Sequence, residues 1–207
     1  MGTRGLYGIR KNGIDKATYN HFDSYPDWLG KEISKFCINN SVGDLENFFN
    51  NIKLVDEESN PTDEQIEECK AAGYADFSVS NGDENEWYCL LRELQGNFTE
   101  YQKCIDNNSN VYMTDGIDFI KDSLWCEYAY IINLDDNVLE FYVGNQTEPQ
   151  EGNRYGTEVS YDGFDGTKFY PCKLLMTFPL EEMNDAVQVA WAMDAAVEDD
   201  CKSNNDD

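Results

Sequence analysis

The segment at residues 124–144, LWCEYAYIINLDDNVLEFYVG, constrains the fold more than any other part of this sequence. β-Branched and aromatic residues lie on both sides of a short turn, LDDN, at residues 134–137. Few helices have this composition, whereas paired strands commonly do. We therefore predict a β-hairpin over residues 124–143, with its turn at the two aspartates.

Two other segments predict strands for the same sheet. At the N-terminus, GLYGIRK and IDKATYN are separated by Asn12-Gly13, a pair that adopts the positive φ angles of a type I′ turn. This pattern predicts an N-terminal hairpin over residues 3–20. The apolar run TKFYPCKLLMTF predicts a further strand at residues 167–178.

The remaining apolar patterns have helical spacing. Helices are predicted at residues 28–38, from Ser41 to Ile52, and from a capping box at Thr62 and Gln65 to Gly73. A longer helical pattern at residues 83–104 is interrupted at Gly96-Asn97. A last helix is predicted to start at Pro179, with these residues facing inward: Leu180, Met183, Val187, Ala190, Met193 and Val197. The order of elements predicts an α+β fold, a layered sandwich in which an antiparallel sheet is covered by helices. We expect a single domain at residues 1–199, an acidic helical insertion at about 56–104, and a disordered acidic tail at 200–207.

The charge of the chain is strongly negative and unevenly distributed. The net charge is −26, yet 14% aromatic residues supply the apolar surface that disordered chains lack. Residues 1–53 contain seven Lys and Arg against six Asp and Glu, whereas residues 54–207 contain eight against 35. Such a surface repels nucleic acids and anionic membranes and attracts basic proteins. Direct binding to nucleic acid or to a membrane is therefore not expected.

The cysteines indicate a reducing compartment. There are seven, an odd number without a C-x-x-C pair, and several occupy apolar positions of helix or strand patterns. With a single histidine, they also lack the spacing of a zinc site. The sequence has no apolar segment typical of a signal peptide or membrane helix. We expect a cytoplasmic protein without a cofactor.

Three segments carry a resemblance to a known family. They are GTRG at residues 2–5, HFDSYP at residues 21–26, and EYAYIINLD at residues 127–135. Together they resemble a family of cytosolic proteins from bacteriophages and bacteria to which no activity is assigned. The resemblance spans most of the chain except the acidic region around 56–85. It implies no functional residue, and it favours a phage accessory role in the cytoplasm of the host cell.

Two candidate catalytic sites follow from the N-terminal residues. Thr3 lies at the start of the predicted first strand, where an N-terminal-nucleophile amidohydrolase places its nucleophile, but it becomes terminal only after processing beyond Gly2. His21 and Asp23 are two residues apart, so on a strand they share a side, and an aspartate can orient a histidine as a general base. The alternatives are structural: a strand start at Thr3, and a turn in which Asp23 caps the backbone.

Two further candidate sites are carboxylate clusters. Asp162 and Asp165 lie among glycines in YDGFDGTKF, which permits a calcium site but also suits an ordinary turn. The predicted helix at 83–104 presents a row of acids that resembles the charge of a nucleic acid: Asp83, Glu84, Glu86, Glu93 and Glu100. The alternative is that these acids confer solubility.

The sequence thus favours an interaction protein over an enzyme. We expect an acidic phage-type protein that binds a basic protein surface, in its most specific form a nucleic-acid mimic that inhibits a nucleic-acid-binding defence factor of the host. An amidohydrolase using Thr3 and a passive virion or housekeeping component are the alternatives. The first requires a processed N-terminus, and the second predicts no partner.

Overall fold

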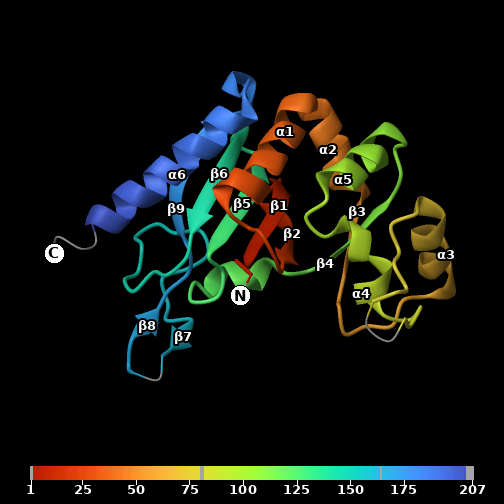
Figure 1. Ribbon diagram of the computed structural model, residues 1–207, viewed down its shortest axis with the longest axis horizontal. Coiled ribbons are helices and arrows are strands. Elements are labelled where there is room, and N and C mark those ends of the chain that lie inside the picture. Colours follow the sequence, from red (N-terminus) through yellow and green to blue (C-terminus); the bar gives the residue numbers. More distant parts are fainter. Residues whose placement is uncertain (1, 80–81, 164, 204–207) are drawn as a thin grey trace.

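A five-stranded mixed sheet forms the centre of the computed structural model, which describes residues 2–79, 82–163 and 165–203 (Figure 1). The strand order is β2-β1-β5-β6-β9. The strands span β1 (Gly5–Lys11), β2 (Ile14–Asn20), β5 (Tyr128–Asn133), β6 (Val138–Val143) and β9 (Lys173–Pro179). Both predicted hairpins are present, and the predicted strand at 167–178 is divided between β8 (Lys168–Phe169) and β9. The α+β prediction is confirmed.

The two hairpin turns have the backbone geometry that their sequences require. Asn12 and Gly13 have φ angles of 54° and 75°, and Asn137 has a φ of 55°. The turns also contact one another, because the Asp135 carboxylate accepts hydrogen bonds from the Asn12 and Gly13 amides at 2.6 and 2.9 Å. This contact fixes the end of β1 beside the end of β5.

An antiparallel sheet was predicted from the sequence, but the observed sheet is mixed. β1 pairs with β2 on one side in antiparallel register and with β5 on the other side in parallel register, from Gly5 opposite Tyr128 to Arg10 opposite Asn133. Parallel pairing requires a long crossover connection, and the helical residues between β2 and β5 supply one. The remaining pairs, β5 with β6 and β6 with β9, are antiparallel.

Helices cover one face of the sheet. They are the π-helical turn η1 (Pro26–Gly30), α1 (Lys31–Asn39), α2 (Val42–Asn51), α5 (Phe98–Asp106) and α6 (Ala186–Ser203). Alternate strand residues such as Tyr7, Tyr130 and Phe141 pack against them in the main core, and Figure 1 shows α1, α2 and α6 lying over the strands. The predicted helix at 28–38 corresponds to η1 followed by α1.

A smaller apolar cluster covers the opposite face. Leu6, Ala129 and Ile131 point away from the helices and pack with Ile120 of η3 (Ile117–Lys121) and with Cys172. Six of the seven cysteines are buried as free thiols, as the apolar patterns indicated, and Cys201 is exposed. A two-stranded hairpin, β7 (Tyr161–Asp162) with β8, projects from this side of the molecule (Figure 1).

An excursion of the chain leaves and returns through a separate parallel strand pair. β3 (Ile52–Val55) and β4 (Val111–Thr114) are hydrogen-bonded, and the residues between them form α3 (Asp63–Ala72), α4 (Trp87–Leu90), η2 (Arg92–Leu94) and α5. Helix α3 has the predicted capping box at Thr62 and Gln65 and ends at Gly73 in the left-handed region. Figure 1 shows α3 and α6 at opposite ends of the molecule.

The helical pattern predicted at 83–104 is only partly correct. The predicted interruption at Gly96-Asn97 is confirmed, since Gly96 has a φ of 68° and α5 begins at Phe98. Before it, Trp87, Leu90 and Leu94 are buried as the apolar stripe indicates, but the chain is helical only in short pieces. A backbone hydrogen bond also joins this region to the residues after α3: the Glu93 amide donates to the Tyr74 carbonyl at 3.0 Å.

The last helix differs from its prediction at both ends. Pro179 ends β9, a 3-10 turn η4 (Leu180–Glu182) follows, and α6 begins at Ala186. This later start changes which residues face inward: Val189 is buried and Val187 is 40% exposed. The disordered tail predicted from residue 200 is helical at its start, since α6 continues to Ser203. Asp200, in this last part of α6, pairs with Lys173 at 2.6 Å. Residues 204–207 of the predicted tail lie outside the described residues.

Candidate functional site

The segments at 2–5, 21–26 and 127–135 contact one another, and residues of the first and the third line a cavity. Ser24 donates its amide hydrogen to the Thr3 carbonyl at 3.2 Å, and the Tyr130 hydroxyl donates to the Ser24 carbonyl at 2.9 Å. A cavity of about 490 Å³ opens beside them. We call it the N-terminal pocket; its lining includes Gly2, Arg4, Trp125, Glu127, Tyr128, Asn145, Gln146, Val197, Asp200 and Cys201.

Small residues make this convergence possible. A Cβ atom at Gly5 would lie 2.5 Å from the Tyr128 carbonyl oxygen and 2.6 Å from the Ser24 Cβ, so only glycine allows the strands and the turn to approach this closely. Arg4 and Glu127 are joined by two hydrogen bonds. The Glu127 amide donates to the Arg4 carbonyl, and the Arg4 amide donates to the side-chain oxygen Glu127 Oε1. The wall of the pocket is therefore rigid.

The pocket presents both signs of charge and two aromatic side chains, Trp125 and Tyr128. The Arg4 guanidinium lies 5.0 Å from the centroid of the Trp125 ring, a cation–π arrangement. Asp200 on the opposite wall is neutralised by Lys173. The arrangement suits contact with a polar partner.

Thr3 does not face the pocket. Gly2 and Arg4 line it, whereas Thr3 between them is only 5% exposed. An N-terminal nucleophile must reach a substrate with its hydroxyl. The position of Thr3 therefore fits a structural strand start and gives no support to amidohydrolase chemistry.

His21 and Asp23 do not form a dyad on a strand, because β2 ends at Asn20. His21 Nδ1 lies 2.7 Å from the Tyr19 hydroxyl, and its ring packs edge-on against Phe22. Asp23 adopts a left-handed conformation with a φ of 53°. It also does not cap η1, whose N-cap residue Tyr25 makes no side-chain capping bond.

The turn at 21–25 is instead organised by Asn20, which the sequence analysis missed. Its side-chain amide donates to the Phe22 carbonyl and to Ser24 Oγ at 2.8 Å, and the residue is 4% exposed. A buried asparagine at the end of a strand, followed by a turn, is the signal that could have identified it.

The five predicted binding acids do not form one row. Glu84 pairs with Lys70 at 2.7 Å, and Glu100 pairs with Lys103 at 2.6 Å. Asp83 accepts hydrogen bonds from Asn85 in a local turn. Glu86 and Glu93 lie on other pieces of the interrupted helix. The continuous acidic helix face predicted from the sequence is therefore absent.

The aspartates at 162 and 165 belong to the β7–β8 hairpin. Asp162 is in β7, and Asp165 accepts a hydrogen bond from the Thr167 amide at 3.0 Å, which holds its pKa below the usual value. Phe164 between them lies outside the described residues. Among the described residues, no group of three or more His, Cys, Asp or Glu side chains is placed to hold a metal ion.

A buried charge network was not predicted from the sequence. Glu140 is 3% exposed in the middle of β6, and the Arg154 guanidinium contacts both its carboxylate oxygens, Nη1 to Oε1 at 2.9 Å. Asn133 and Tyr142 also donate to Glu140. Burial opposes ionisation of Glu140, but these hydrogen bonds outweigh it and hold the pKa below its usual range. Because Arg154 is on the loop after β6, the network fastens that loop to the sheet.

Comparisons with known proteins identify no relative: no family model, curated protein or solved structure matches the chain. Within the described residues, no helix combines the length and apolar character needed to cross a lipid bilayer.

Proposed function

We infer that this protein acts by binding a basic surface of another protein. The observation that carries the proposal is the segment at residues 56–68, which we call the α3 acidic segment. It contains seven acids and no Lys or Arg: Asp56, Glu57, Glu58, Asp63, Glu64, Glu67 and Glu68. All except Glu68 are exposed.

Little of this charge is neutralised within the chain. Lys70 lies 3.5 Å from Glu67, but its shorter contact is to Glu84 at 2.7 Å. Asp63 and Glu64 lie in the first turn of α3, where their negative charges interact favourably with the positive end of the helix dipole. That structural role does not extend to Glu57 and Glu58, which precede the helix. Their exposed carboxylates are available to a partner.

The charge spacing on α3 supports the more specific proposal of nucleic-acid mimicry. Its ten residues span about 15 Å and carry four acids and one lysine, so the acids occur once per about 4 Å. Phosphates along one strand of duplex DNA are spaced by about 3.4 Å. A protein site that binds a phosphate backbone presents cations at a comparable spacing. A host defence factor with such a site would be inhibited by occupation of that site.

Capture of partners from a bacterial lysate tests the proposal. The tagged full-length protein is compared with a variant in which Glu57, Glu58 and Glu64 are changed to glutamine. The matched control carries the same loss of charge elsewhere, at Glu148, Glu151 and Glu158, which are also exposed. Captured proteins are identified by mass spectrometry, and their DNA binding is measured with and without the acidic protein.

The proposal predicts capture of a basic protein by the wild type and the control, with loss in the α3 variant. Inhibition of DNA binding by that partner would support mimicry. Capture that survives the α3 substitutions, or that is unchanged between low and high salt, would contradict the proposal, because exposed charges interact weakly beyond a Debye length of about 8 Å at physiological salt.

A further inference from the structure

Two tryptophans are unusually exposed beside α6. Trp191 on α6 is 66% exposed and Trp28 on η1 is 61% exposed, whereas Trp87 in the core is 1% exposed. Large exposed aromatic side chains near one another indicate a binding surface, because tryptophan is among the residues that contribute most to protein interfaces.

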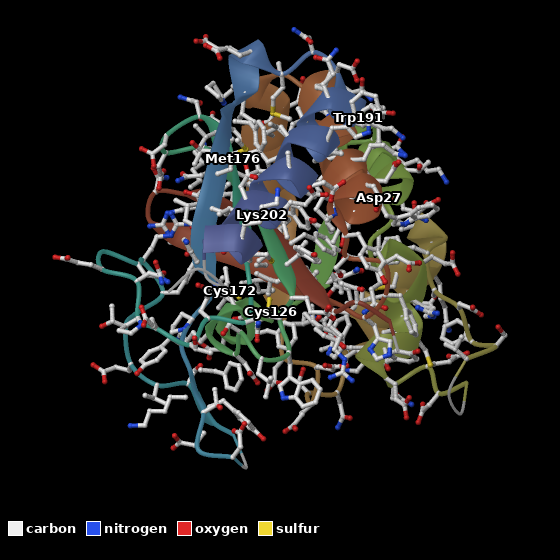
Figure 2. All side chains as sticks on the ribbon, turned by 60° about the vertical axis from the view of Figure 1, so that its left-hand side comes forward. Asp27, Cys126, Cys172, Met176, Trp191 and Lys202 are labelled. Atoms are coloured by element: carbon white, nitrogen blue, oxygen red, sulfur yellow. The ribbon has the colours of Figure 1, made fainter. Side chains whose placement is uncertain are left out.

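The two elements that carry these tryptophans are packed together. A Cβ atom at Gly30 of η1 would lie 3.1 Å from the Met193 sulfur of α6, so the end of η1 rests directly on the helix. Helical spacing places Val187, Trp191 and Glu198 on the outer side of α6, together with Asp194. Figure 2 shows Trp191 on α6 and Asp27 on the neighbouring turn of η1.

Carboxylates accompany the tryptophans. Asp194 and Glu198 are four residues apart on α6, so they lie on one face of the helix. Burial raises the pKa of Asp194, and the negative charges of Asp27 and Glu198 raise it further. The neighbouring cation is Lys202, which is 4.0 Å from Glu198 and closer to Asp199, at 3.3 Å. We define the α6–η1 surface by Asp27, Trp28, Val187, Trp191, Asp194 and Glu198.

We propose that the α6–η1 surface docks an arginine-bearing segment of the basic partner. The proposal rests on the proposed function, since both require a basic protein. Indole rings stack on a guanidinium, and carboxylates accept its hydrogen bonds in pairs, so rings and acids together select arginine over lysine. Repulsion disfavours a second copy of this chain as the occupant, because each copy carries a net charge of −26.

The selectivity for arginine gives the test. Calorimetry at 150 mM NaCl measures binding of the full-length protein to octa-arginine and octa-lysine peptides, both acetylated and amidated. The variants are Trp191→Ala, Trp28→Ala and the combined Asp27→Asn, Asp194→Asn and Glu198→Gln. The charge-matched control is the glutamine variant at Glu57, Glu58 and Glu64, at the opposite end of the molecule (Figure 1). Far-UV circular dichroism checks that each variant is folded.

We expect octa-arginine to bind the wild type about three- to tenfold more tightly than octa-lysine, as a cation–π contact in a partly exposed site implies. Each tryptophan variant should reduce that ratio toward one, and the triple α6–η1 variant should weaken both peptides more than the α3 control does. Equal affinity of the wild type for both peptides, an unchanged ratio in the tryptophan variants, or absence of binding would overturn the inference. If only the α3 control weakens binding, the proposed function stands and this docking surface is wrong.

Discussion

Removal of the Arg154 guanidinium is the sharpest test of how this fold is held together. In Arg154→Ala, the Glu140 carboxylate remains buried on β6 without the guanidinium that pairs with it. Removing one partner of a buried ion pair destabilises a protein by about 3–5 kcal/mol. Because the Arg154 side chain is 27% exposed, water can reach the vacated position, and we expect the lower end, about 3 kcal/mol.

Urea denaturation followed by circular dichroism measures this loss. For a chain of 207 residues, it corresponds to a fall in Tm of about 6–12 °C. The matched control is Lys121→Ala, which removes a surface pair whose side chains are 49% and 84% exposed and should change stability by less than about 1 kcal/mol.

The pH dependence of the same variant has a definite sign. The pKa of Glu140 is lowered in the folded protein, so its contribution to stability is present above the unfolded pKa and is lost as pH falls through the folded value. In Arg154→Ala this contribution disappears, and the deficit in stability relative to wild type should narrow as pH falls below the ordinary glutamate pKa of 4.5. Adding Glu140→Gln to the variant should restore part of the stability at pH 7. A loss below about 1 kcal/mol, or a deficit that does not narrow in acid, would refute the reasoning.

Three other predictions concern the N-terminal pocket and its surroundings. Gly5→Ala forces a Cβ against the Tyr128 carbonyl and should lower the free energy of unfolding by about 2 kcal/mol or more in urea titrations, whereas an unchanged midpoint would show that the strands can separate. Asn20→Ala removes the donor to Phe22 and Ser24 and should be destabilising by about 1–2 kcal/mol in the same assay; a neutral effect would mean that the turn holds itself. Cys201 should be the one thiol of seven that reacts with a disulfide reagent before unfolding, as counted by intact mass, and rapid labelling of several thiols would contradict the buried positions of the others.

The local parts of the fold were predictable from the sequence. The Asn12-Gly13 turn and the capping box at Thr62 each depend on a few adjacent residues whose side chains set the backbone angles. The parallel pairing of β1 with β5 was not predictable in this way, because the two strands are joined by more than a hundred residues of crossover. Nothing in either strand specifies the direction of its distant neighbour.

The errors in the acidic region and in the last helix have a shared cause. The buried apolar stripe before Gly96 was interpreted as one helix, but the chain there forms only α4 and η2, and the Glu93 amide bonds to the Tyr74 carbonyl. Likewise, the pattern after Pro179 was extended through β9's end and η4, so that Val187 was assigned to the core. Apolar periodicity reports burial reliably, whereas continuity depends on tertiary hydrogen bonds.

The candidate site was only partly predictable. The segments at 2–5, 21–26 and 127–135 were identified separately, but their contacts with one another depend on the sheet order that places β1 beside β5. The exposure of Trp28 and Trp191 could not be inferred, since tryptophans at helical spacing are usually buried. The burial of Glu140 was similarly hidden, because its partner Arg154 is on a loop without a regular pattern.

Binding of a basic protein by the α3 acidic segment is best tested by measuring how the affinity for an identified partner depends on salt. The equilibrium affinity of the purified partner is measured between 50 and 300 mM NaCl, for the wild type and for the variant with glutamine at Glu57, Glu58 and Glu64. We expect the affinity of the wild type to fall steeply as the salt concentration rises. The variant should bind more weakly, and its affinity should change less with salt. An affinity that is the same for both proteins and indifferent to salt would contradict this expectation.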